Sequence, residues 1–136
     1  MDDLSSTLRI SSADMKAQGM RLRVISENIV NAGSLPQAPG DMPYRRKIVT
    51  FQNELDHNID LKTVRVGKII PDKLDFTKHF DPNHPAADAD GYLLVPNVNP
   101  LIKMMDMREA QRSNDANLSV IKNTKSMLKD TTNLLR

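Results

Sequence analysis

Apolar residues that recur every seven positions at both ends of the chain most constrain what this sequence can fold into. Near the N-terminus the repeat consists of Leu8, Met15, Leu22 and Ile29, with Ile25 beside them. Near the C-terminus Met107, Ile121, Leu128 and Leu135 fall on the same seven-residue spacing, which Asn114 interrupts, with Met104 and Leu118 at intervening positions. Such a repeat places an apolar stripe along one face of an α-helix and drives helices together. Both ends are therefore expected to form long helices that pair with each other and with neighbouring chains.

The limits of the two helices are indicated by their flanking residues. The first is expected over residues 4–32, with Gly33 as the residue that ends it. Gly19 lies inside this helix, so we expect either a bend there or the close approach of another backbone. Asn99 followed by Pro100 is typical of a helix start, because proline at the first helical position has a preset φ. The second helix then runs without glycine or proline to Arg136.

The middle of the chain has a different character. Residues 34–44 hold three prolines and a glycine, which exclude a helix and disfavour a strand. Short strands are predicted at 47–51, 61–70 and, more weakly, around 74–80, with an extended piece at 92–95. The expected fold is mainly α with a small β insert. It divides into an N-terminal helix (1–33), a Pro-rich middle segment (34–100) and a C-terminal helix (101–136), the two helices pairing as in a coiled coil.

Composition indicates that this chain cannot bury its own apolar stripes completely. The 136 residues include only 4% aromatics and no tryptophan, so a core built from large side chains would be thin. Long amphipathic helices leave an apolar face that a small monomer struggles to cover. We therefore expect neighbouring molecules to complete the burial.

Charge and cysteine content exclude several classes of function. The net charge of +2 is too mild to indicate a nucleic-acid partner, and the basic residues are not clustered. No cysteine is present, so disulfides, thiolate zinc sites and cysteine nucleophiles are excluded. The acidic start and the lack of an apolar segment predict that there is no cleavable signal peptide. If the protein works outside the cytoplasm, a different export route is expected to carry it.

Two loops could suggest metal chemistry, but a simpler interpretation fits each better. His79 and His84 lie five residues apart with no compelling third ligand, as two surface histidines would. Residues 88–91, Asp-Ala-Asp-Gly, resemble the middle of a calcium loop, yet both chelating ends are missing and a simple turn explains them. Nothing resembles a nucleophile elbow or a phosphate-binding loop. We expect no enzyme activity, no metal, no cofactor and no small-molecule substrate.

Several segments resemble the flagellar axial proteins. Residues 26–32, Ser-Glu-Asn-Ile-Val-Asn-Ala, are similar to the signature near the N-terminus of that family, and Tyr-Arg-Arg-Lys at 44–47 matches the segment after that signature in rod proteins. Segments 80–92, 95–100, 104–110, 116–118 and 134–136 are similar to one branch, a subunit of the proximal rod. The matching positions that we take as family motif are Asn28, Asn31, Tyr44, Arg45, Asn97, Asn99, Pro100, Asp106, Arg108, Glu109 and Asn117.

This resemblance implies a structural subunit of the bacterial flagellar basal body, used in motility. Such proteins leave the cell through the flagellar type III export apparatus without a cleavable signal, and they stack helically in the periplasm. Their terminal helices surround the export channel, and the rod carries torque. Implied partners are further copies, the rod adapter to the MS ring, other proximal rod proteins and the distal rod. The alternative is a cytosolic coiled-coil adaptor or export chaperone, for which a β-containing middle segment would be an odd addition.

Overall fold

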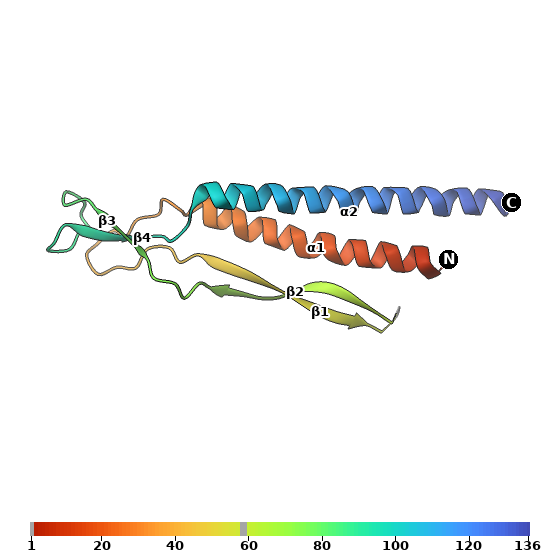
Figure 1. Ribbon diagram of the computed structural model, residues 1–136, viewed down its shortest axis with the longest axis horizontal. Helices are drawn as coiled ribbons and strands as arrows, with labels where there is room; N and C mark the ends of the chain where they lie inside the picture. The colour runs from red at the N-terminus through yellow and green to blue at the C-terminus, as the bar shows by residue number, and fades with distance from the viewer. Residues whose placement is uncertain (1, 58–59) are drawn as a thin grey trace. The chain divides into compact units, whose positions relative to one another are not determined.

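The computed structural model describes residues 2–57 and 60–136, which form two long helices joined by a β-containing middle (Figure 1). In chain order the elements are α1 (Asp2–Val30), β1 (Lys47–Asp56), β2 (Leu61–Pro71), β3 (Thr77–Phe80), β4 (Tyr92–Val95) and α2 (Pro100–Leu134). The prediction of a mainly helical chain with a small β insert is confirmed.

The chain divides into two compact units, and each helix contributes to both. The first, here called the hairpin unit, comprises Met1–Arg23, Val49–Lys68 and Arg108–Arg136. The second, the linker unit, comprises Val24–Ile48 and Ile69–Met107.

In the hairpin unit α1 and α2 lie side by side and run in opposite directions (Figure 1). Asp14 accepts a hydrogen bond from the Asn117 side chain, and Arg21 Nη2 lies 3.9 Å from Glu109 Oε2. A later residue of α1 thus meets an earlier residue of α2, which fixes the antiparallel order.

The most buried side chains of this unit are small. Ala110 is fully buried, Ala17 is 2% exposed, and Ser11 and Thr124 are nearly as inaccessible. Small residues at such positions let neighbouring backbones approach closely, so the unit is held together by close packing rather than by large apolar side chains.

The same unit contains the β1–β2 hairpin, a two-stranded sheet. Thr50 Oγ1 accepts a hydrogen bond from the Lys68 N–H at 2.9 Å, and Thr63 Oγ1 donates to the Glu54 carbonyl at 3.3 Å, so the strands are antiparallel. Strand β1 extends to Asp56, beyond the predicted end at residue 51. Polar residues continue it because cross-strand bonds, rather than an apolar alternation, hold them in place.

The linker unit contains the second sheet, in which β3 and β4 pair antiparallel from Thr77 opposite Val95 to Phe80 opposite Tyr92. Asp88 Oδ1 accepts hydrogen bonds from the backbone N–H groups of Asp90 and Tyr92 at 3.0 and 2.9 Å. Gly91 has a φ of +84°, a conformation that favours glycine. The interpretation of residues 88–91 as a turn is therefore confirmed.

The helix ends confirm one prediction and correct another. Asn99 Oδ1 accepts hydrogen bonds from the N–H groups of Leu101 (3.1 Å) and Ile102 (3.4 Å), so Asn99 is the predicted N-cap. Gly33, by contrast, does not adopt the left-handed conformation expected of a helix-ending glycine, because α1 ends at Val30 and a turn comes next. Of the two alternatives expected at Gly19, the close approach of another backbone is not found among the described residues, because a Cβ placed there would have no atom within 4 Å.

Candidate assembly site

Asn28 is the polar centre of the linker unit. This residue of α1 is only 2% exposed. Its amide nitrogen donates to the Lys47 carbonyl at 2.9 Å, while its Oδ1 accepts from the Lys47 N–H at 3.0 Å and from the Tyr44 hydroxyl at 2.9 Å. The side chain thus pairs with the backbone of Lys47 as a neighbouring strand would, and it fixes the end of α1 to the start of β1.

Tyr44 is half-buried beside Asn28, and its burial raises the pKa of the phenol above the ordinary value of 10.0, with Lys47 acting in the opposite direction. Lys47 itself reaches back to Glu27 on α1 at 3.0 Å. Asn28 and Tyr44, two positions selected by the family resemblance, are therefore in direct contact.

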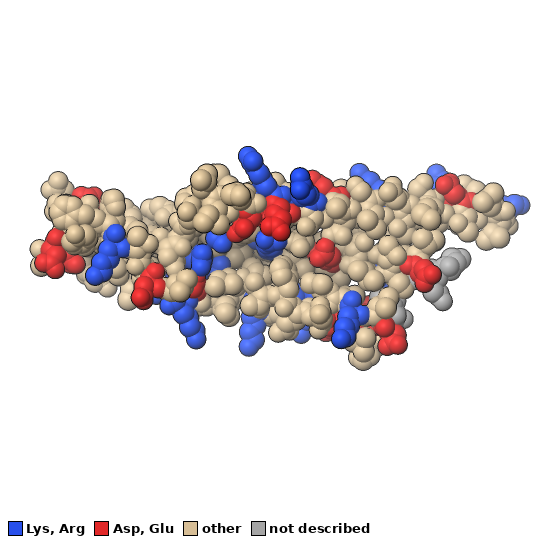
Figure 2. Space-filling model, viewed as in Figure 1, with Lys and Arg blue, Asp and Glu red and all other residues tan. Residues whose placement is uncertain are grey.

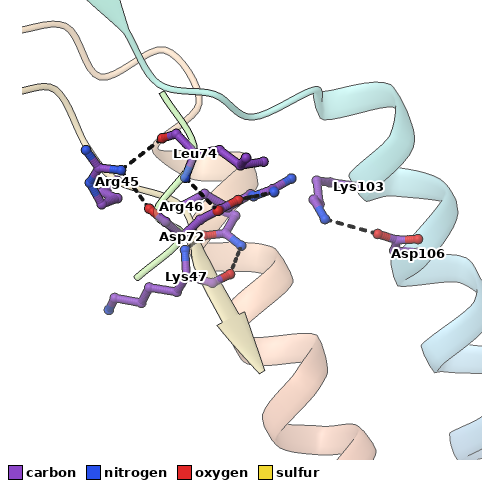
Figure 3. A network of polar contacts seen from close by, with 8 residues as sticks. Arg45, Arg46, Lys47, Asp72, Leu74, Lys103 and Asp106 are labelled. Carbon is purple, nitrogen blue, oxygen red and sulfur yellow. Dashed lines mark hydrogen bonds and ion pairs between the residues drawn. The ribbon is translucent and has the colours of Figure 1, made fainter. Parts of the chain in front are cut away.

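Arg45 and Arg46 converge on Asp72, as Figure 3 shows. Arg45 Nη1 donates to the carbonyls of Asp72 (2.6 Å) and Leu74 (3.0 Å), and its guanidinium lies 4.2 Å from the centre of the Phe76 ring. Arg46 Nε donates to Asp72 Oδ2 at 2.9 Å. The hydrogen bond from the Leu74 N–H, together with those from Arg46, holds the pKa of Asp72 below its ordinary value of 3.8. Asp72 is buried, and no periodic pattern in the sequence would have selected it.

The remaining family-motif positions have varied surroundings. Asn31 donates to the Glu27 carbonyl at 2.8 Å, and Asp106 pairs with Lys103 at 3.2 Å on α2 (Figure 3). The side-chain nitrogen and oxygen of Asn97 are buried without a hydrogen-bond partner in the described part of the chain. Arg108 is exposed.

The structure places the apolar repeat residues in two groups by exposure. Ile25 is buried, and Leu8, Met15, Leu22, Ile29, Met107, Ile121 and Leu128 are half-buried. The exposed ones are Met104 (51%), Leu118 (38%) and Leu135 (79%). The described part of the chain therefore covers these three side chains only in part.

Sequence reasoning missed two of the residues at the centre of the helix contact, Ala110 and Thr124, which are the buried residues of α2. They lie three and seventeen residues after Met107, which the apolar repeat did identify, and Asn117 between them was selected only through the family resemblance. A search for large apolar side chains passes over alanine and threonine. Their regular spacing between repeat positions is the signal that could have identified them.

A groove of about 420 Å³ separates α1 from the hairpin inside the hairpin unit. Ala13, Ala17 and Met20 line it from the helix, and Val64 and Val66 from β2. Small helix residues leave this space because they do not reach the strand side chains.

The histidine and acidic side chains of the described residues were candidates for metal binding. His84 Nδ1 accepts a hydrogen bond from the Ala86 N–H at 3.1 Å, which gives this histidine a local structural contact. Within residues 2–57 and 60–136 no group of three or more histidine or acidic side chains is arranged to hold a metal ion. In the same ranges neither helix is long and apolar enough to cross a membrane.

Figure 2 shows charges of both signs interspersed over the visible face.

Comparison with known proteins identifies the relatives of this chain. Residues 89–134 match the family model described as flagellar basal body rod FlgEFG protein C-terminal. The chain is 49% identical to the flagellar basal-body rod protein FlgC of Agrobacterium fabrum, over 100% of this chain and 98% of the relative. The proteins of the same name from Bacillus subtilis and Borreliella burgdorferi are each 34% identical, over 90% and 98% of this chain and 91% and 98% of theirs.

Proposed function

The chain belongs to the FlgC family of flagellar basal-body rod proteins, and from that premise we propose that it is a subunit of the proximal rod, which assembles helically around the export channel. It is a structural subunit of the flagellar rod. The observation that carries the proposal is the 49% identity to a rod protein along the whole chain. The rival, a cytosolic adaptor or chaperone, has no support from these relatives.

The proposed working parts are the two terminal helices. Residues 1–33 and 101–136 would form the tube around the channel as a coiled-coil-like pair, and residues 34–100 would lie outside it and make lateral contacts. Met104, Leu118 and Leu135 are exposed in the single chain, which supports a role for them in contacts between subunits. No catalytic function is proposed.

The proposed partners are further copies of this chain, other proximal rod proteins, the adapter to the MS ring and the distal rod. The proposed location is the periplasmic part of the basal body. The proposed route is the flagellar type III apparatus, without a cleavable signal. The rod would then pass torque from the motor to the hook.

Fractionation of cells tests this proposal. A tagged copy of the chain should sediment with detergent-extracted basal bodies, and it should be absent from that fraction in a strain that lacks the MS ring. Recovery of all the tagged chain in the soluble fraction of flagellated cells would favour the adaptor and overturn the proposal.

A further inference from the structure

The β1–β2 hairpin carries two strand edges that nothing in the described part of the chain pairs with. Strand β1 has 10 residues and β2 has 11, and their sheet contains no third strand among the described residues. The outer edge of a strand presents backbone N–H and C=O groups that another strand can bind. A further strand would add cross-strand hydrogen bonds to this two-stranded sheet.

We propose that the outer edge of β1 in one copy of this chain pairs with the outer edge of β2 in a second copy, which extends the hairpin into a continuous sheet. The charges on the two strands support this choice of partner. Residues 49–56 carry Glu54 and Asp56 and no basic residue, whereas residues 61–68 carry Lys62, Arg65 and Lys68 and no acidic one.

Acidic side chains of β1 already form ion pairs with basic side chains within the single chain. Arg65 Nε lies 3.2 Å from Glu54 Oε2 across the hairpin, and Asp56 contacts Arg9 of α1 at 3.4 Å. A second copy would bring the same acidic strand against the same basic strand. Two β1 strands, or two β2 strands, would instead oppose like charges, which destabilises a strand pair.

The proposed contact is heterologous, because one surface of each copy binds a different surface of the next. Such a contact leaves one unused edge at each end of a growing array, so it adds copies without closing on a pair. Phe51, Leu55 and Leu61 are each 42% exposed on these strands, and a neighbouring strand would cover part of their apolar surface.

Two charge variants test the pairing. In the acidic variant, Lys62→Glu with Lys68→Glu, both strands become net negative, while the Glu54–Arg65 pair stays in place. In the basic variant, Asn53→Lys with Glu54→Lys, both strands become net positive. Each variant alone opposes like charges between copies. When the acidic and basic variants are mixed, the net negative strands of one variant can pair with the net positive strands of the other. Each contact between copies then again joins opposite charges.

The measurement is sedimentation velocity of the full purified chain over a concentration series, with far-UV circular dichroism to confirm that each variant is folded. The wild-type chain should associate, each variant alone should associate at least about tenfold more weakly, and an equimolar mixture should recover association near the wild-type level. The matched control, Lys122→Glu with Lys129→Glu at exposed positions of α2, makes the same change in net charge as the acidic variant and should associate like the wild type.

Three results would overturn the proposal: a wild-type chain that stays monomeric throughout, variants that associate normally, or a mixture that is no better than its components. A defect of folding within one chain cannot be rescued by a second copy, so the mixture separates the two explanations. None of these results depends on the basal body, so the assignment to the flagellar rod is tested separately.

Discussion

At the scale of single residues, Asn28 and Arg45 act through contacts with backbone groups. Asn28 uses its amide as a substitute for a strand backbone, and Arg45 uses its guanidinium to bind two carbonyls. These contacts link segments that are nineteen to twenty-nine residues apart and fix the irregular linker where propensity alone would leave it free.

Replacing Asn28 with alanine should destabilise the chain by ~2 kcal/mol, because buried polar groups that lose their partner cost about 1–3 kcal/mol. The groups left unpaired would be the Lys47 backbone and the Tyr44 hydroxyl. Urea unfolding measures the change. Asn123→Ala, at an exposed position of α2, is the control and should have little effect. Equal stability of the two variants would show that the Asn28 contacts contribute nothing.

Asp72 should make the stability depend on pH in the acid range. Its pKa is lower in the folded chain than the ordinary value of 3.8, so the folded state binds the proton less readily than the unfolded one. The stabilisation by Asp72 is therefore complete well above about pH 4 and is lost as pH falls through the folded pKa. Urea unfolding between about pH 2 and 6 should show a smaller acid loss in Asp72→Asn. An identical slope in the two proteins would contradict this assignment.

At the scale of elements, the sequence predicted the helices, cap and turn that depend on residues close together in the chain. Both helices, the Asn99 cap and the Asp88 turn result from periodicity and turn chemistry that act over a few residues. The long-range partners were not predictable, because nothing local indicates that Asn28 meets Lys47 or that two arginines meet Asp72. The extension of β1 to Asp56 was missed for the same reason, since bonds to the facing strand hold it.

The contact between α1 and α2 depends on small residues, and this gives an element-scale prediction. Ala110 is fully buried, so Ala110→Leu should force the helices apart and cost ~1–3 kcal/mol, as overpacking of a close contact does. Ala116→Leu adds the same side chain at an exposed position of the same helix and should be nearly neutral. Thermal unfolding compares the two. A stabilised Ala110→Leu variant would mean that the helices are loosely packed there.

At the scale of the whole molecule, exposed apolar residues on α2 indicate that neighbours complete the burial. Leu101, Met105, Met127 and Leu134 are each more than half exposed. Long helices gain most of their stability from packing rather than from intrinsic propensity. The free chain should therefore be less ordered than the assembled one.

Amide hydrogen exchange on the dilute free chain tests this expectation. Residues near both ends of the chain should exchange rapidly, because the helices there have little local core. Slow exchange throughout residues 8–29 and 104–135 would contradict it and would show that the helix pair is stable without partners.

The central claim is that the apolar repeat builds the rod, and Leu128 tests it most directly. Leu128 is half-buried on the repeat, whereas its neighbour Lys129 is exposed. Leu128→Asp removes an apolar contact, at ~2 kcal/mol or more for the loss of a leucine side chain, and adds a charge to that contact. The penalty recurs in every subunit, so assembly should suffer more than the single chain.

The measurement is the fraction of tagged chain that sediments with detergent-extracted basal bodies in cells whose only copy is the variant. We predict that Leu128→Asp is expressed and soluble but absent from that fraction, in non-motile cells, while Lys129→Ala is present at the wild-type level. If Leu128→Asp enters basal bodies normally and Lys129→Ala does not, the wrong face of α2 has been assigned to assembly.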